Sequence, residues 1–426
     1  MSEWKETTLG EICLKITDGA HHSPKEFDGG KPMFSVKNMR DQGFDYNGVK
    51  TISDEDFVKL VNSGCQPQKD DILIAKDGSV MKHIFRVKGD IDYVLLSSIA
   101  IVRPDKSKVN PSYLVYAIKD PLTTDLILNN FVGGSGVPRI VLKDFKKVDL
   151  TIPSIETQKS IASILSSLDD KIDLLHRQNA TLEKMAETLF RQWFMERRPE
   201  PVEGEAKEEW KSKPLSSIAV FLNGLACQKF PPKNNIEKLP VLKIKELSSG
   251  ITENSDWATT NVKPEYIVKN GDVIFAWSAS LMVKIWDGQD CILNQHLFKV
   301  TSEYYPKWFY YLWCKYHLDE FIVKAASHAT TMGHIKRSDL DEAMVLIPSD
   351  KELEEMTLAV EPLISKIISN NKQIKLLVNL RDILLPKLMS GEIRVESHRD
   401  ETSVETNNDT ATLSPIGAAY KTNQHG

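Results

Sequence analysis

Cysteine is scarce in this chain of 426 residues, and its five cysteines are scattered without a C-x-x-C pair: Cys13, Cys65, Cys227, Cys291 and Cys314. This spacing argues against a zinc knuckle and for a reducing compartment. Apolar runs are also short, and none reaches the roughly 18 residues that span a bilayer. The first residues, MSEWKETTLG, lack the apolar core of a signal peptide. We therefore expect a cytoplasmic protein without a membrane segment.

Catalytic motifs are missing as well. The sequence has no G-x-x-x-x-G-K-[ST] phosphate loop and no D/N-P-P-Y/F methylation motif, so neither ATP hydrolysis nor methyl transfer is expected here. The GGSG at residues 133–136 has no lysine after it and is predicted to be a flexible loop. His21 and His22 have no H-E-x-x-H or carboxylate cluster around them, which favours a surface loop over a metal site. We expect no catalytic residue, no metal and no cofactor in this chain.

Basic charge is not in excess either, since the formal net charge is −5. Acidic residues concentrate in residues 196–209 and 396–426, so the remainder is close to neutral and any basic surface must be local. Hydrophobic residues make up 41% and charged residues 27%, which is typical of a globular protein. The length predicts two or three domains.

What the sequence does contain is an internal duplication. Trp4-Lys5 corresponds to Trp210-Lys211, DILIAKDGS (71–79) to DVIFAWSAS (272–280), and IVLKDFKKVDLTIPS (140–154) to IKRSDLDEAMVLIPS (335–349). The loops between these anchors differ completely, and KITDGAHHSPKEFDGG has no counterpart in FLNGLACQKFPPKNN. A shared scaffold with divergent loops indicates two recognition modules of different specificity, although drift of a duplicated fold is the alternative.

Each copy has a mixed α/β pattern. Apolar runs predict strands at residues 33–36, 72–75, 95–102 and 148–152, and again at 241–244, 273–276, 293–300 and 344–347. Segments 111–118 and 306–316 are predicted to be helices that begin with a proline in the first turn.

A long helical segment follows each copy. Apolar residues recur at alternating spacings of four and three at Ile161, Leu165, Leu168, Ile172, Leu175, Asn179, Leu182, Ala186, Leu189 and Trp193. The second segment repeats the pattern at Met356, Val360, Leu363, Ile367, Asn370, Ile374 and Leu377. This seam predicts an antiparallel coiled coil of about 50 Å. Two separate helices, each packed on its own α/β unit, are the alternative.

Polar residues lie both within the apolar seam of these helices and outside it. Asn179 and Asn370 are single polar seam residues that would fix the register, and we expect them not to face each other. Asp169 and Asp170 lie outside the seam and are expected to be solvated or to face a partner.

Three segments carry a resemblance to a known family. The stretch IPSIETQKSIASILSSLDDKIDLLHRQNATLEKMAETLFRQWF resembles the central conserved region of the specificity subunit of type I restriction–modification enzymes. ILLPKLMSGEI (383–393) is similar to the end of the distal conserved region, and GDVIFAWSAS resembles a recurring strand motif of the family. The resemblance covers residues 1–395 and is specific over the helices but weak in the variable domains.

The resemblance implies an α+β protein in which two duplicated target recognition domains are separated by a long antiparallel two-helix coiled coil. The implied boundaries are domain 1 (1–154), the central helix (155–195), an acidic linker (196–209), domain 2 (210–349), the distal helix (350–394) and a disordered polar tail (395–426). Such a subunit is not catalytic. It reads a bipartite, asymmetric site in double-stranded DNA.

Partner subunits supply the chemistry in this family. Two modification subunits methylate adenine N6 with S-adenosylmethionine, and motor-nuclease restriction subunits use ATP and Mg. We expect Phe190, Trp193 and Phe194 to be exposed on the helices and to contact a partner. A two-module protein–protein scaffold without DNA binding remains the alternative function.

Base readout requires polar side chains at base edges and cations at phosphates, and two loops of each copy provide them. The first loop follows the strand of the GD motif, and the second precedes the last strand. In the first copy the candidates are Lys76, Lys82, Arg86, Arg139 and Lys143. In the second copy they are Ser278, Lys284, His328, Thr330, Thr331, His334, Lys336 and Arg337.

Overall fold

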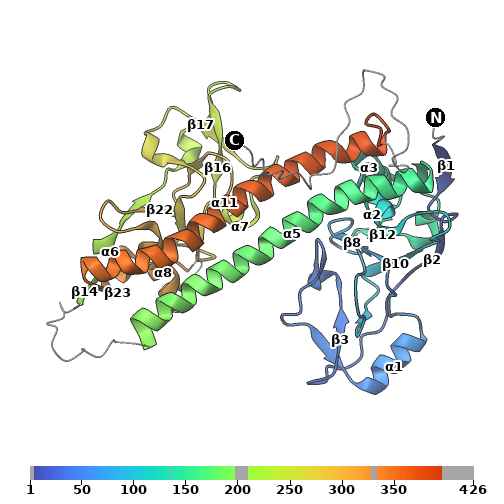
Figure 1. Ribbon diagram of the computed structural model, residues 1–426, viewed down its shortest axis with the longest axis horizontal. Coiled ribbons are helices and arrows are strands. Elements are labelled where there is room, and N and C mark those ends of the chain that lie inside the picture. The colour runs from blue at the N-terminus through green and yellow to red at the C-terminus, as the bar shows by residue number, and fades with distance from the viewer. Residues whose placement is uncertain (1–3, 135, 197–209, 328–332, 396–426) are drawn as a thin grey trace, which may run out of the picture. The chain divides into compact units, whose positions relative to one another are not determined.

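The computed structural model describes residues 4–134, 136–196, 210–327 and 333–395 (Figure 1). The chain divides into two compact units. Unit 1 combines the chain up to Lys171 with the chain from Leu377 onward, and unit 2 is Ile172–Leu376. The acidic linker and the polar tail are predicted at positions outside the described residues, apart from Glu196 and Val395.

Unit 1 is built on a four-stranded antiparallel sheet. In spatial order its strands are β2 (Cys13–Asp18), β10 (Ile99–Pro104), β7 (Ile72–Ala75) and β8 (Ile84–Arg86). Two helices, α2 (Pro111–Lys119) and α3 (Pro121–Asn130), contribute buried side chains to the same apolar core. Each helix begins at a proline, and the side chain before it, Asn110 or Asp120, accepts a hydrogen bond from the first turn as an N-cap.

A second, smaller sheet of unit 1 has the order β6 (Lys50–Ile52), β3 (Lys31–Phe34) and β9 (Val94–Leu95). Strand β3 is parallel to β9 and antiparallel to β6. Helix α1 (Asp54–Asn62) follows β6, and the ring of Phe34 stacks on Phe44 with centroids 4.2 Å apart. The smaller elements are η1 (Val36–Asn38), β4 (Met39–Arg40), β5 (Gly43–Phe44), β11 (Val132–Gly133), β12 (Arg139–Ile140) and α4 (Leu142–Phe145).

Unit 2 repeats this topology and confirms the duplication. Its main sheet has the order β15 (Val220–Asn223), β22 (Leu297–Thr301), β19 (Val273–Ala276) and β20 (Met282–Ile285). Its second sheet has the order β17 (Trp257–Thr259), β16 (Lys238–Leu242), β21 (Cys291–Leu293) and β18 (Ile267–Val268), and β16 is again parallel to β21. The helices are α6 (Leu215–Ile218), η3 (Cys227–Lys229), α7 (Ile244–Ser249), η4 (Pro264–Tyr266), α8 (Lys307–Tyr316), α9 (Leu318–Ser327) and α10 (Arg337–Glu342).

The first and last strands of each copy pair with each other. Strand β1 (Lys5–Thr8) is antiparallel to β13 (Asp149–Ile152), and β14 (Lys211–Pro214) is antiparallel to β23 (Met344–Ile347). One sequence prediction needs correction in both copies. The sequence predicts a single strand at 95–102 and another at 293–300, but a short turn divides each run between two sheets. The first run contributes to β9 and β10, and the second contributes to β21 and β22.

Both long helices form as predicted, α5 (Ile155–Arg191) and α11 (Asp350–Met389). In unit 1, Leu165 of α5 belongs to the same apolar cluster as Leu385 and Leu388 of α11. In unit 2, Phe190 of α5 shares a cluster with Val360 of α11. The start of each helix therefore packs with the end of the other, which makes the pair antiparallel (Figure 1).

The two seam asparagines do face each other, so the sequence prediction for them is wrong. Nδ2 of Asn370 donates to Oδ1 of Asn179 at 2.9 Å, and Nδ2 of Asn179 donates to Oδ1 of Asn371 at 2.6 Å. Asn370 is completely buried. A slipped register would leave these amides without partners at a cost of about 1–3 kcal/mol each, so the pair fixes the alignment of the helices.

The expectation for Asp169 is also wrong, although Asp170 is exposed as predicted. The Asp169 carboxylate accepts hydrogen bonds from Nη1 of Arg381 at 2.9 Å and from the hydroxyl of Tyr116 at 2.8 Å. Its side chain is only 15% exposed. Asp169 therefore joins α5 to α11 and α2 within unit 1.

Four of the five cysteines are buried, Cys13 is partly buried, and all five are free thiols. Across the described ranges, no helix is both long enough and apolar enough to cross a membrane. The described residues also contain no cluster of three or more side chains that could hold a metal ion.

Candidate nucleic-acid interface

The two candidate loops of unit 1 meet at one end of the main sheet. The backbone N–H of Ile140 donates to the carbonyl of Lys76 at 3.0 Å, and that of Gly78 donates to Pro138 at 2.8 Å. A bridge between Asp77 and Arg139 completes the contact. We call this surface edge 1 and define it as residues 76–79, residues 138–140, the end of β2 at Asp18, and Ser97–Ser98.

Unit 2 repeats the arrangement at the equivalent end of its sheet. Ile335 donates to the carbonyl of Trp277 at 3.0 Å, and Ala279 donates to Gly333 at 2.8 Å. Ser278 and His334 form the bridge. Edge 2 is accordingly residues 277–280, residues 333–335, the end of β15 at Asn223, and Gln295–His296. The sequence predicts the loops but not that they pair.

Each edge is shaped by a tight turn in its first loop and by a glycine after its first strand. Gly78 and Ala279 occupy the same place in the first loop, and both have a left-handed backbone, with φ of 74° and 56°. Gly19 and Gly224 follow the ends of β2 and β15, where a Cβ atom would lie 2.1 Å from Leu95 O or 2.3 Å from Asn294 O. Only glycine permits this close approach.

These glycines correct one sequence expectation. The segments after β2 and β15 were expected to lack a counterpart, but they begin in the same way. Ala20 bridges Leu96, and Leu225 bridges Asn294, both in parallel. The copies therefore share the framework of each edge and differ in the side chains it carries.

The structure separates the candidates of unit 1 into two groups. Lys82, Arg139 and Lys143 are exposed and make no ion pair within the described chain. Arg86 lies on β8 and binds Asp70 at 2.6 Å. Burial acts to raise the pKa of Asp70, but hydrogen bonds from Lys106 and Arg86 outweigh it and hold that pKa below its usual value. Arg86 therefore stabilises unit 1 through this ion pair instead of being a free cation for DNA.

The prediction that Lys76 contacts DNA is wrong, because Lys76 is buried and its charge is paired with carboxylates. Its side chain is 8% exposed, and its Nζ lies 3.2 Å from Asp18 Oδ2 and 3.0 Å from Asp77 Oδ1. Such a lysine cannot reach a phosphate without breaking two ion pairs. Its two ion pairs join the end of β2 to the loop after β7 and so stabilise edge 1.

Lys76→Met is therefore expected to destabilise the protein rather than to weaken DNA binding alone. Removing one member of a buried ion pair leaves the other charges uncompensated and costs about 3–5 kcal/mol. Denaturant unfolding measures the loss, and exposed Lys82→Met is the matched control, with a change within about 0.5 kcal/mol. Unchanged stability of Lys76→Met combined with reduced DNA binding would contradict this assignment.

In unit 2, His334, Lys336 and Arg337 are exposed at or next to edge 2. Ser278 cannot contact DNA directly, because it is buried and its hydroxyl lies 3.2 Å from Nδ1 of His296. Lys284 lies on β20, exposed, and its Nζ binds the carbonyl of Leu247 at 3.2 Å. His328, Thr330 and Thr331 lie outside the described residues.

Sequence reasoning missed four residues of edge 2. They are Asn223, Trp277, Gln295 and His296. The Trp277 ring stacks on Phe298 with centroids 5.6 Å apart and lies 5.9 Å from the ring of His296. The turn Asn294–His296 could have signalled a break in the apolar run 293–300, which was predicted as one strand.

The partner-contact candidates need correction too. Phe190 and Phe194 are buried in the core of unit 2, where both rings contact Trp313, at 4.9 and 5.2 Å between centroids. Trp193 is partly buried and meets Trp308 edge-on. The end of α5 and the π-helical segment η2 (Gln192–Glu196) that follows it therefore contribute to the core of unit 2, and these three residues do not form an exposed patch.

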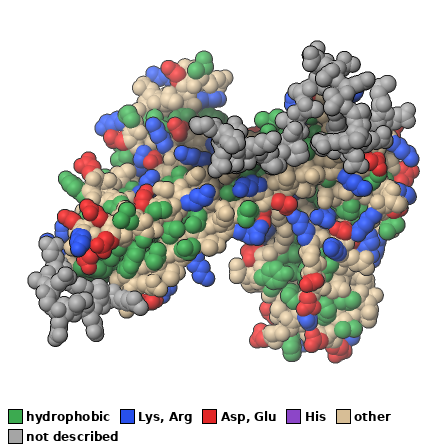
Figure 2. Space-filling model, viewed as in Figure 1, with side chains coloured by type: hydrophobic (Ala, Val, Ile, Leu, Met, Phe, Trp, Pro, Cys, Tyr) green, Lys and Arg blue, Asp and Glu red, His purple; other side chains and the backbone are tan. Residues whose placement is uncertain are grey.

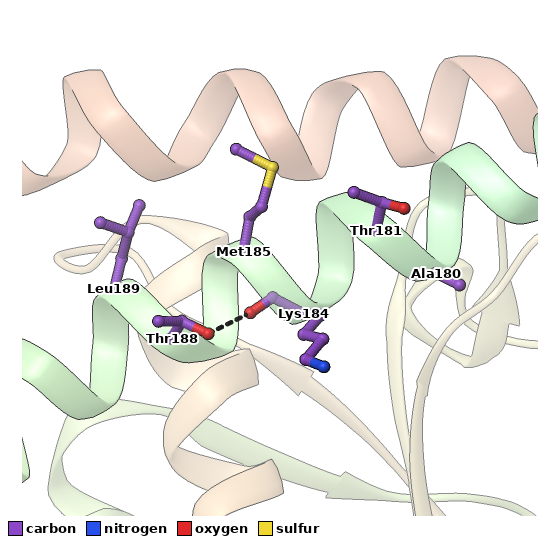
Figure 3. Close-up of a pocket in the computed structure, with 6 residues that line it drawn as sticks. All are labelled: Ala180, Thr181, Lys184, Met185, Thr188 and Leu189. Carbon is purple, nitrogen blue, oxygen red and sulfur yellow. Dashed lines mark hydrogen bonds between the residues drawn. The ribbon is translucent and has the colours of Figure 1, made fainter.

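Other apolar side chains of the helices are exposed. They are Leu174 and Met185 on α5, and Leu358, Leu376, Leu380 and Ile383 on α11. Met185 lines an open groove on α5 together with Ala180, Thr181, Lys184, Thr188 and Leu189 (Figure 3). Hydrophobic side chains also gather where α5 ends and α11 begins (Figure 2). Leu376, Leu380 and Ile383 have the i, i+4, i+7 spacing of one helix face.

Comparison with known proteins agrees with this duplicated architecture. The family model of the type I restriction modification DNA specificity domain matches residues 1–184 and 207–379. The type I restriction enzyme MjaIX specificity subunit of Methanocaldococcus jannaschii is 31% identical, over 93% of this chain and 97% of that protein. The chain belongs to the type I restriction–modification DNA specificity family.

Further members of the family align along their whole length. The HindI specificity subunit of Haemophilus influenzae is 22% identical, over 92% of this chain and all of that protein. The solved S subunit from M. genitalium has the same fold, with a TM-score of 0.56, 14% identity, and coverage of 91% of this chain and 96% of that one. The two family matches each contain one α/β copy and most of the helix that follows it.

Proposed function

We propose that this chain is the DNA-specificity subunit of a type I restriction–modification complex, in which edge 1 and edge 2 each read one half of a bipartite site in double-stranded DNA. As a specificity subunit it is non-catalytic, and its role is to select the DNA sequence on which its partners act. The single observation that supports the two-edge assignment is that the same paired loops recur in both units with different side chains.

The differences between the edges concern residues at equivalent positions. Lys76, Asp77 and Arg139 of edge 1 correspond to Trp277, Ser278 and His334 of edge 2. Asp18 at the end of β2 corresponds to Asn223 at the end of β15. Lys76 and Ser278 are buried, so the difference that DNA can meet lies in the exposed side chains Arg139, His334 and Asn223. Two frameworks that present different hydrogen-bonding groups are suited to two different base sequences, because base edges are distinguished by their donors and acceptors.

Exposed cations accompany both edges. Arg139 and Lys143 lie at or beside edge 1, and Lys336 and Arg337 lie beside edge 2, where Nη2 of Arg337 also reaches the carbonyl of Phe221 at 3.4 Å. Such side chains suit phosphate contacts, which position a protein on the duplex while base contacts specify the sequence. DNA binding by the complex should therefore weaken steeply as salt increases.

We assign the chemistry to partner subunits. Two modification subunits would use S-adenosylmethionine to methylate adenine N6, and motor-nuclease subunits would use ATP and Mg. Leu380 and Ile383, two exposed apolar residues of α11 within unit 1, are the docking surface we propose for the modification subunits, in place of Phe190, Trp193 and Phe194. The buried free thiols are compatible with a cytoplasmic location.

The deciding experiment is to purify the chain with the proteins encoded beside it and to map methylated adenines in the host DNA. The proposed function predicts one recurring bipartite sequence. A protein–protein scaffold would instead yield no methylated motif and no salt-dependent DNA binding when the modification subunits are present. Either of these results would replace the proposed function with the scaffold.

The helix pair also predicts how the two half-sites are spaced. Four residues added to α5 after Lys171 and four added to α11 after Leu376 keep Asn179 opposite Asn370. Each helix grows by about 6 Å, roughly one turn. The spacer between the half-sites should lengthen by one to two base pairs, at about 3.4 Å per base pair. Methylation mapping measures it, and an unchanged spacer with retained activity contradicts the prediction.

A further inference from the structure

Asn223 lies at the end of β15, within edge 2, and its side chain is exposed. The indole N–H of Trp277 donates to Oδ1 of Asn223 at 3.2 Å. Asn223 is also paired with Phe298 of β22 through the sheet, and the Trp277 ring stacks on that same phenylalanine. The asparagine amide is therefore held in one orientation by a packed aromatic ring.

The hydrogen-bonding capacity left on this amide is specific. A carbonyl oxygen accepts two hydrogen bonds, and Trp277 uses one of them. The two N–H groups on Nδ2 have no partner among the described residues. The side chain thus offers one acceptor and a donor side by side. This pair matches adenine, which presents its N6 amino donor next to the N7 acceptor in the major groove.

We propose that Asn223 reads an adenine in the half-site bound by unit 2, and that Trp277 is the positioning residue that orients its amide. Oδ1 accepts a hydrogen bond from adenine N6, and Nδ2 donates one to N7. This inference rests on the proposed DNA-specificity function and adds the residue and the base to it.

The equivalent position of unit 1 supports the assignment by contrast. Asp18 has only acceptors, its side chain is 12% exposed, and its carboxylate is occupied by Lys76 at 3.2 Å. His21 lies 3.3 Å from the other carboxylate oxygen. Edge 1 therefore cannot read adenine in this way. At the same position of the two frameworks, Asp18 binds Lys76 within unit 1, whereas Asn223 of unit 2 is the residue we propose to contact the base.

Two variants test the proposal in the complex with the modification subunits. Asn223→Asp keeps the acceptor for Trp277 but loses the donor to N7, and a carboxylate favours the amino group of cytosine. Trp277→Phe keeps an aromatic ring beside Phe298 but removes the N–H that orients Asn223, together with the second ring of the indole. Binding is measured on duplexes that carry each of the four base pairs at every position of the mapped site.

For Asn223→Asp we expect a loss of roughly 5- to 150-fold in affinity at one adenine of the unit 2 half-site, with cytosine gaining relative to it. For Trp277→Phe we expect a weaker adenine preference at that same position. Asn261→Asp, the same change at an exposed asparagine elsewhere in unit 2, is the control and should leave every position unchanged.

The outcomes separate this inference from the function on which it rests. If the unmodified complex methylates no recurring sequence, the proposed function fails. If it has a bipartite site but both variants retain the same base preferences, the function stands and the inference is overturned. A uniform loss of affinity for all duplexes also overturns it, because a structural or phosphate role weakens binding without regard to sequence.

Discussion

Replacement of residues 1–154 by the corresponding segment of another family member changes one half of the recognised DNA site completely and leaves the other half intact. Edge 1 lies entirely within that segment, whereas edge 2 lies within unit 2. The graft must keep Ile161 and Leu165 of α5 and Leu388 of α11, which complete the core of unit 1. Methylation mapping of host DNA reads out both halves at once.

The reciprocal replacement of residues 210–349 is the matched control, and it should change only the other half. Thermal unfolding of each chimera verifies that the grafted unit is folded. A simultaneous change of both half-sites in either chimera would show that the two units do not read DNA independently.

We expect that Leu380→Glu combined with Ile383→Glu abolishes assembly with the proposed modification subunits. Both side chains lie on one face of α11, with 41% and 59% of their surfaces exposed, and neither belongs to the buried core cluster of unit 1. Burial of the surface that remains exposed on each side chain is worth about 1 kcal/mol, and each introduced carboxylate adds a desolvation cost of at least ~1–3 kcal/mol. Together these effects weaken assembly by roughly 1,000-fold or more, as measured by co-purification and ultracentrifugation.

Leu122→Glu is the control for this change. Leu122 lies on α3 and is 75% exposed, so it tests whether any exposed leucine of unit 1 has the same effect. The control should assemble normally, and all variants should melt at the temperature of the unmodified chain. Normal co-purification of the double variant would show that the modification subunits dock elsewhere.

The sequence predicts the helices and the duplication because both depend on local or repeated patterns. The alternating spacing of four and three that includes Leu165 and Ile172 is a property of each helix alone. The register between the helices is not local, since it depends on the α/β units that connect them. For this reason the sequence could not show that Asn179 faces Asn370.

The candidate residues of the interface show the same limit. A loop lysine next to a strand is usually solvated, but Lys76 is neutralised by Asp18, which lies far away in sequence and reaches it only through the pairing of β2, β10 and β7. Phe190 and Phe194 look like exposed residues at a helix end. They are buried because α8 carries Trp313 against them.

The chain order of unit 1 has a consequence for synthesis on the ribosome. This unit needs the end of α11, from Leu377 to Met389, which is made about 200 residues after Lys171, and Leu385 and Leu388 are part of its core. At about 5–20 residues per second, the first α/β segment waits roughly 10–40 s for its last helix. During that interval Ile161 and Leu165 lack their α11 neighbours, whereas unit 2 is continuous in sequence and can close first. The N-terminal unit is therefore the last to be completed, and a chain that stops before Leu377 leaves it open to chaperones and proteases.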